Sequence, residues 1–385
     1  MIEEVLVRKR LEFIKNGPIR AQRRLFGKGL LINEGESWAK QRRLTQPAFH
    51  PGNLAPYVPV IAERTSRMLD SWAEGEVRDI HLEMKNLLMG IVAECLFGPT
   101  VAPKAAEIGE AIEGAMDRYA ARRGAARLVP DWVPLPESRR YVQGIRDIDE
   151  FVSETVAARR AVANDRQDLL SMLISARDES GQPMSQGQIR DEAINLFVGG
   201  FDTPALALSW AWYLLARHPA FAERIAAEAD EILGSGQPVL ADLKRLEFTQ
   251  KVLKESMRLY PPAWILGREP VDDVEIGGVA IPRGTIVLIS QWVMHRDGRF
   301  FDRPMQFDPD RWRDSLELPR FVYFPFGAGP RVCIGAAFAT LECTFALAMI
   351  AQRFRFELSA STPVVPQPTM TLRPKGGVPS RIARR

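Results

Sequence analysis

A glycine-rich turn, Phe326–Gly335, surrounds Cys333 and leads into a predicted helix. Backbone N–H groups at the start of a helix can point at the sulfur, and the helix dipole favours a negative charge there. Both effects lower the pKa of a thiol and stabilise its thiolate form. Gly327 and Gly329 allow a bulky group to approach the backbone closely, because glycine has no side chain. The turn is therefore a candidate site for thiolate chemistry.

Several interpretations of this turn compete. An isolated cysteine in an apolar setting is most often simply buried, which suits Cys95 and Cys343. The glycine pair within 327–329 resembles half of a dinucleotide fingerprint, but the third glycine and a surrounding strand–helix–strand unit are missing. A catalytic nucleophile needs a base, and no histidine lies near Cys333 in the sequence. A thiolate that binds a metal remains, and Arg331 could bind an acidic group of the ligand.

The composition limits the class of protein. The 385 residues are 46% hydrophobic and 26% charged, which suits a soluble globular chain and excludes collagen, a disordered polymer and a disulfide-rich mini-protein. The net charge of +3 gives no argument for nucleic acid binding. The three cysteines form no C-x-x-C pair and the four histidines form no H-E-x-x-H pair, which disfavours zinc and iron–sulfur sites. Without an 18-residue apolar run or a signal peptide, we expect a cytoplasmic protein with no membrane span.

The predicted elements place this turn late in a helix-rich chain. An irregular segment, Phe300–Pro325, leads to the cysteine turn, and the helix after it ends near Phe354. Helices first and small sheets late predict one mainly α (α+β) domain over residues 1–385. A capping box of Ser185 and Gln188 begins the longest helix. The expected helices are Glu36–Phe49, Pro59–Glu74, Leu82–Phe97, Ala105–Ala121, Glu137–Arg160, Asp168–Arg177, Ser185–Arg217, Pro219–Leu233 and Leu246–Leu259, and the expected strands are Val274–Ile276, Val279–Ile281 and Thr285–Ser290.

The cysteine turn resembles the haem-thiolate loop of the cytochrome P-450 family, F-G-x-G-x-[RH]-x-C-x-G, at every fixed position. The resemblance implies that Cys333 is the axial ligand of a haem b iron, and that thiolate donation favours O–O cleavage. It also implies that Phe326, Gly327, Arg331 and Gly335 help to bind the haem.

The segment from Gly199 to Thr203 resembles the family's distal helix motif, [AG]-G-x-[DE]-T. By this resemblance, Thr203 orders a water near bound oxygen and Asp202 relays protons, and both are catalytic. From the sequence alone, Thr203 could also simply bond back to the Gly199 carbonyl, and the two interpretations are compatible. Pro204 departs from the family pattern, so we expect a fixed kink and a Gly200 carbonyl without its helical partner.

Two further motifs follow the family pattern. Glu255 and Arg258 form an E-x-x-R pair, and Arg311 matches the third member of the family's structural triad, although a surface ion pair is the simpler interpretation of the first two. Trp38 and Arg42 form a W-x-x-x-R pair that the family places beside the haem propionates. Two other arginines, Arg268 and Arg331, match further propionate contacts, and His295 matches a position near the haem edge.

The resemblance implies a bacterial-type haem-thiolate monooxygenase that inserts one oxygen atom of O₂ into an apolar organic substrate. A separate electron donor would be needed, a ferredoxin or flavodoxin with its reductase, and Lys40, Arg42 and Arg43 with Arg331 could form a basic patch for it. The alternatives are a peroxide-driven peroxygenase on the same fold, which the intact Asp202–Thr203 pair disfavours, and a non-catalytic haem-binding protein.

The substrate is the least defined part of this interpretation. The expected pocket residues are Phe197, Val198, Gly200, Ala263, Trp264 and Ile265. The stretch Phe13–Gly29 resembles the family's substrate loop, and its basic residues suit either a carboxylate-bearing substrate or simple solvent exposure. Family members usually begin with a further helix and two strands, which this chain lacks by the resemblance. We therefore expect a short N-terminus that opens near the family's second helix, at about Glu3–Phe13.

Overall fold

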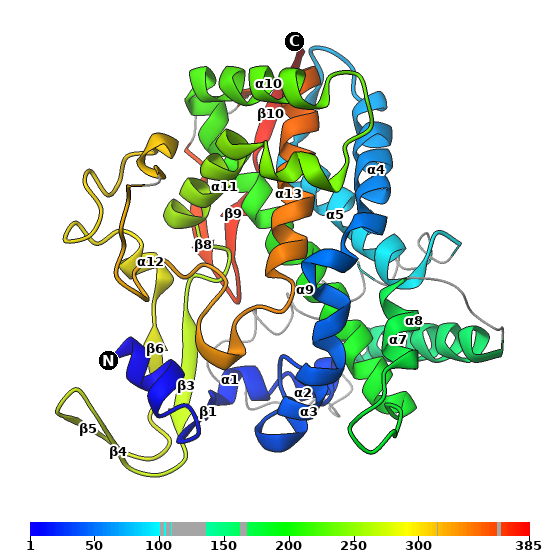
Figure 1. Cartoon of the computed structure of the whole chain (residues 1–385), viewed down its shortest axis with the longest axis vertical. Helices are drawn as coiled ribbons and strands as arrows, with labels where there is room; N and C mark the ends of the chain where they lie inside the picture. The colour runs from blue at the N-terminus through cyan, green and yellow to red at the C-terminus, as the bar shows by residue number, and fades with distance from the viewer. Residues whose placement is uncertain (101–103, 105–108, 110–135, 162–167, 314, 360–362) are drawn as a thin grey trace. The chain divides into compact units, whose positions relative to one another are not determined.

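A computed structural model describes the chain except for residues 101–103, 105–108, 110–135, 162–167, 314 and 360–362. The described part is rich in helices and carries small antiparallel sheets (Figure 1), as the sequence predicts. The helix expected over Ala105–Ala121 lies outside the described residues apart from Gly109. Within the described part, no helix is long and apolar enough to cross a membrane.

Most of the predicted helices form within a few residues of their expected bounds. The capping box at Ser185 is confirmed, because the Gln188 N–H donates to the Ser185 hydroxyl at 3.2 Å and the Ser185 N–H donates to Gln188 Oε1 at 3.0 Å. The longer helices are α3 (Gly35–Thr45), α4 (Val58–Asp70), α5 (Ile80–Phe97), α7 (Pro136–Ala161), α8 (Leu169–Ser175), α9 (Gln186–Arg217), α10 (Pro219–Leu233), α11 (Glu247–Leu259) and α13 (Ala336–Arg353); the short ones are α1 (Gly17–Arg20), α2 (Arg23–Phe26) and α12 (Gln291–Met294).

The described strands form two three-stranded sheets and two hairpins, all antiparallel. One sheet has the order β1–β3–β6, from Phe13–Lys15, Leu266–Pro270 and Val287–Ile289. The other has the order β2–β10–β7, from Val77–Asp79, Pro379–Arg384 and Phe354–Leu358. The hairpins pair β4 (Val274–Ile276) with β5 (Val279–Ile281) and β8 (Val365–Pro368) with β9 (Leu372–Lys375).

The prediction for the first residues is wrong in part. The expected helix Glu3–Phe13 is only a π-helical turn over Glu4–Arg8, and Phe13 already begins strand β1, paired with Pro270 of β3. Val5, Leu6 and Phe13 are buried in one cluster with residues of β4, β6 and the segment before the cysteine turn. Burial against these distant residues, rather than helical spacing, decides the conformation here.

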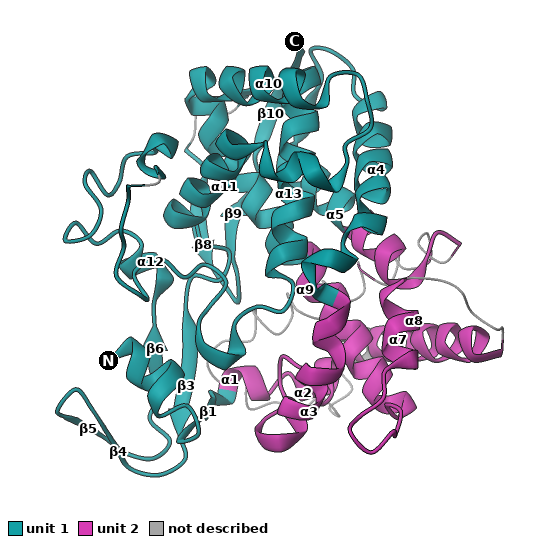
Figure 2. Ribbon diagram, viewed as in Figure 1, with its two compact units in different colours: residues 1–17, 49–88, 202–385 teal, residues 18–48, 89–201 magenta. Residues whose placement is uncertain are grey.

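The chain divides into two compact units (Figure 2). Unit 1 consists of residues 1–17, 49–88 and 202–385, and unit 2 of residues 18–48 and 89–201. Unit 1 contains the sheets and the cysteine turn, and unit 2 contains α1–α3, α7, α8 and the first half of α9. A single haem-centred domain stays a prediction.

Candidate functional site

The cysteine turn has a defined backbone. Gly327 and Gly329 have φ angles of 75° and 71°, a region that residues with a Cβ rarely adopt. The Cys333 N–H donates to the Phe326 carbonyl at 2.9 Å, which closes the turn, and Gly335 is the N-cap of α13. The turn thus places Cys333 beside the N-terminus of an 18-residue helix, where partial positive charge favours a thiolate.

Exposure separates Cys333 from the other two cysteines. Its side chain is exposed, whereas Cys95 and Cys343 are buried. Burial raises the pKa of the Cys343 thiol well above its usual range.

Two of the expected pocket residues, Trp264 and Ile265, are half-buried in the same unit as Cys333 and lie just before β3.

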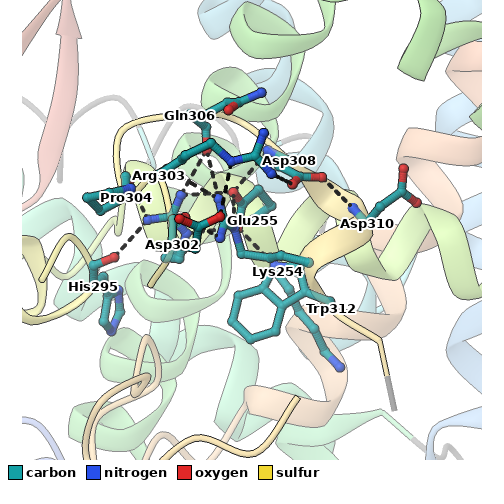
Figure 3. Close-up of polar contacts among 12 residues, drawn as sticks. Lys254, Glu255, His295, Asp302, Arg303, Pro304, Gln306, Asp308, Asp310 and Trp312 are labelled. Atoms are coloured by element: carbon teal, nitrogen blue, oxygen red, sulfur yellow. Dashed lines mark hydrogen bonds and ion pairs between the residues drawn. The ribbon is translucent and has the colours of Figure 1, made fainter. Parts of the chain in front are cut away.

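Glu255 on α11 is the centre of a buried ion-pair network. Its carboxylate accepts two bonds from Arg258, both at 2.8 Å, and one from Arg311 Nε at 2.9 Å. The Trp312 indole N–H and the Asp308 backbone N–H donate to it at 3.0 Å each. Figure 3 shows Glu255 surrounded by residues of the segment from Asp302 to Trp312. The simple interpretation as a surface pair therefore fails, because Glu255 and Arg258 are both completely buried.

Through His295, the ion-pair network also contacts the residues that lead into the cysteine turn. Arg258 Nη1 donates to the His295 carbonyl at 2.8 Å, and the Phe324 backbone N–H donates to the His295 ring Nε2 at 3.0 Å. Burial lowers the pKa of His295 to about 3, so the ring is neutral at neutral pH and can accept that bond. His295 thus ties α11 to the residues that lead into the turn at Phe326.

Asp202 is held by a partner that the sequence did not reveal. Its Oδ1 accepts from Arg373 Nη2 on β9 at 2.9 Å, with side-chain exposures of 8% for Asp202 and 20% for Arg373. Thr203 follows on α9 and is half-buried. Pro204 lies inside α9, which continues through it, and its carbonyl contacts Cys343 Sγ at 3.8 Å. The predicted kink stays a prediction.

The two adjacent glycines of α9 have different environments in unit 2. A Cβ on Gly200 would lie 2.5 Å from Val92 Cγ2 of α5, so this glycine permits close helix packing. Gly199 is exposed and a Cβ there would meet nothing within 4 Å. Phe197 and Val198 are buried, and the Phe197 ring contacts Phe97 and Phe201.

The remaining predicted binding residues lie on separate elements. Trp38 and Arg42 are half-buried one turn apart on α3 in unit 2. Arg268 on β3 and Arg331 before the cysteine are half-buried in unit 1. Two cations of the expected basic patch are partly neutralised, because Lys40 pairs with Asp178 at 2.5 Å and Arg43 with Glu179 at 3.4 Å.

Comparison with known proteins gives the class of enzyme. A family model described as Cytochrome P450 matches residues 1–379. Cyclooctatin synthase from Streptomyces melanosporofaciens is 37% identical over 382 residues, which cover 97% of this chain and 82% of that protein. Pentalenene oxygenase from Streptomyces avermitilis is 31% identical over 372 residues, which cover 95% of this chain and 82% of that protein. The solved structure of cyanobacterial CYP120A1 with retinoic acid bound has a TM-score of 0.89 and 24% identity, covers 99% of this chain and 86% of its own, and shows the same fold.

These matches define a haem-iron oxidoreductase. The chain belongs to the cytochrome P450 family and is a cytochrome P450 monooxygenase. The family implies a haem held through a cysteine thiolate. The donor set fits this group, because Cys333 is the exposed cysteine and lies beside the N-terminus of α13.

Proposed function

We propose that this enzyme inserts one oxygen atom of O₂ into an apolar terpene, most simply as R–H + O₂ + 2e⁻ + 2H⁺ → R–OH + H₂O. The names of three relatives support the substrate class: cyclooctatin synthase, cyclooctat-9-en-7-ol 5-monooxygenase and pentalenene oxygenase. The second of these is 36% identical over 361 residues. Electrons would come from a separate ferredoxin or flavodoxin with its reductase.

The haem, when bound, would supply the iron at which O₂ is activated. Cys333 would hold the iron through its thiolate, and the Phe326–Gly335 turn would keep the sulfur in place. In unit 1, Arg268 and Arg331 are proposed to bind the haem carboxylates. Guanidinium groups suit this role because they bind carboxylates with two parallel hydrogen bonds.

The reaction consumes two protons, and the Asp202–Thr203 pair is proposed to deliver them. The carboxylate of Asp202 accepts a hydrogen bond from Arg373, which holds the side chain in a fixed orientation beside Thr203. The half-buried Thr203 hydroxyl can both accept and donate a hydrogen bond. This pair favours the monooxygenase over the peroxygenase, because a peroxide brings its own protons.

The observation that carries the proposal is the exposed Cys333 at the start of α13. We expect the reduced protein with carbon monoxide to show the red-shifted Soret band of a thiolate-bound haem. C333A should lose this band, and C95A, at a buried cysteine, should keep it. If C333A keeps the band, Cys333 is not the ligand.

The reaction and substrate class need a second experiment. With ¹⁸O₂, a ferredoxin, its reductase and NADPH, a cyclic terpene such as pentalenene should gain a single ¹⁸O. Product formed with hydrogen peroxide alone, and none with O₂ and the electron donor, would instead identify a peroxygenase.

A further inference from the structure

A short segment of unit 2, Gly27–Leu31, lies against the first half of α9 and is bound to it through its backbone. The Lys28 N–H donates to Asp191 Oδ2 at 2.7 Å. The Leu30 N–H donates to Glu192 Oε2 at 3.1 Å, and the Leu31 N–H to Asn195 Oδ1 at 3.0 Å. Three side chains of one helix therefore bind three N–H groups of a segment more than 160 residues away.

Further bonds hold the residues just before the segment and, from α3, the segment itself. Asn195 Nδ2 donates to the Phe26 carbonyl at 2.9 Å, and Arg190 Nη1 donates to the Leu25 carbonyl at 3.0 Å. Gln41 on α3 donates to the Lys28 carbonyl at 2.8 Å and is almost completely buried. The contacts thus form a clamp on both sides of the segment.

Two glycines make this close approach possible. Gly27 has a φ of 58°, and a Cβ there would lie 1.9 Å from Asp191 Oδ1. A Cβ on Gly29 would lie 2.2 Å from Asn195 Nδ2. Since such distances do not occur between non-bonded atoms, a larger residue at Gly27 would displace the Asp191 carboxylate, and one at Gly29 would displace the Asn195 amide and press on the Asp191 backbone carbonyl.

Glu192 differs from its neighbours in the clamp. Its side chain is completely buried, and within the described residues its Oε1 has no hydrogen-bond partner. Burial raises the pKa of Glu192 to about 8, with a smaller contribution from Asp191. Nearby Arg190 is engaged by Asp149 of α7 at 2.6 Å and by Asp191 at 2.9 Å.

The other elements around Glu192 offer it little compensating charge. The segment presents the Leu30 N–H, and the exposed side chain of its Lys28 does not contribute to the pKa of Glu192. The α3 side chain that reaches the segment, Gln41, is a neutral amide bonded to the Lys28 carbonyl. An ionised Glu192 would therefore be a buried charge with one hydrogen bond, which is unfavourable.

We infer that Asp191, Glu192 and Asn195 are positioning residues that latch the Gly27–Leu31 segment onto α9, and that the latch opens with loss of a proton from Glu192. The closed latch holds Glu192 protonated, and exposure to water on opening returns it to the behaviour of an ordinary carboxyl group. This inference concerns the polypeptide alone and does not depend on haem, substrate or redox partner.

Proton linkage fixes the direction of the effect. The closed state binds one more proton than the open state between the ordinary pKa of 4.5 and about 8, so the opening constant rises with pH in this window. The rise is at most about tenfold per pH unit, and it levels off above about pH 8.

Hydrogen exchange of the Leu30 and Leu31 amides tests the latch. Exchange rates are measured at pH 6, 7 and 8 and divided by those of a peptide of residues 18–31, which removes the intrinsic pH dependence. In the wild type, the opening constant should rise up to about 100-fold from pH 6 to pH 8. E192Q keeps an oxygen that can accept from the Leu30 N–H but cannot ionise, so its opening constant should not change with pH. E179Q, at an exposed glutamate of the same unit, should behave as the wild type.

A second measurement covers the case in which E192Q does not fold. Trypsin cleaves after Lys28 within the segment and after Arg23 and Arg24 just before it, and all three side chains are exposed. Wild-type cleavage at these sites, relative to the same peptide, should accelerate from pH 6 to pH 8, and G29A should be cleaved rapidly at both pH values. A wild-type protein with pH-independent protection, or an E192Q variant that opens with the wild-type pH dependence, would overturn the inference.

Discussion

At the scale of single residues, the environment decides which side chain can do chemistry. Cys333 is exposed beside a helix N-terminus, whereas Cys95 and Cys343 are 2% and 4% exposed. A buried thiol stays protonated, because the interior disfavours its charged form. Among the three cysteines, the environment of Cys333 is therefore the one that permits a thiolate.

The partner of Asp202 leads to a prediction at this scale. R373M would leave the Asp202 carboxylate, which is 8% exposed, without its cation. We expect a loss of about 2 kcal/mol in the free energy of unfolding, because a largely buried carboxylate loses a charge-assisted hydrogen bond. Urea unfolding measures this loss. R67M removes an exposed pair with Glu63 and should cost less than about 0.5 kcal/mol; equal losses in both variants would contradict the prediction.

Residues within contiguous motifs could be predicted from the sequence, because their spacing carries the chemistry. The spacing of Glu255 and Arg258 places them on one face of a helix, and they form their ion pair there. Arg373 lies 171 positions from Asp202, so no local pattern could link the two. The same holds for Glu192 and Leu30, whose contact depends on the tertiary fold.

At the scale of elements, periodicity predicts the helices well, whereas the helix that the family resemblance implies for the first residues forms only in part. Helices such as α10 repeat apolar residues at helical spacing, and α10 matches its expected bounds. The conformation of the π-helical turn Glu4–Arg8 depends instead on tertiary packing, because the Leu6 carbonyl lies against Gly329 of the cysteine turn. A Cβ on Gly329 would lie only 2.2 Å from that oxygen.

G329A tests this contact between elements. The substitution introduces strain of about 1–2 kcal/mol from the φ of 71° and also displaces the Leu6 backbone. We expect a larger loss of stability than in G278A, where φ is 81° but no atom lies within 4 Å of the new Cβ. Thermal unfolding compares the two variants. A loss in G329A no greater than in G278A would show that the Leu6 contact contributes nothing.

At the scale of the whole molecule, the buried His295 and the half-buried His81 limit stability at acidic pH. Burial lowers the pKa of His81 to about 4 and that of His295 to about 3. In the unfolded chain these two rings take up protons below about pH 6.5. In the folded protein the same rings stay uncharged until the pH falls to about 4. Stability is therefore lost as the pH falls through this window.

H81N should make the free energy of unfolding depend less steeply on pH in the acidic range. Between pH 6.5 and 4.5, we expect the slope of unfolding free energy against pH to decrease by about 1.4 kcal/mol per pH unit, because one proton-binding group of the unfolded chain is removed. Urea unfolding at four pH values measures the slope. H50N, at an exposed histidine, should leave it unchanged; an unchanged slope in H81N would assign the loss of stability at acidic pH to other groups.

The division of the chain into two units could not be predicted from the sequence. Unit 1 is assembled from three stretches of the chain, and α5 and α9 contribute residues to both units. No change of composition marks these boundaries, because they fall inside continuous helices.

The Glu255 network has a consequence for the order of assembly. Its carboxylate on α11 is satisfied only when Arg258 beside it and Arg311, 56 positions later, are both in place. A half-docked chain would leave a charge stranded in an apolar interior, at a cost of several kcal/mol. Partly assembled forms are therefore high in free energy and sparsely populated. The network thus makes docking of the 302–312 segment cooperative.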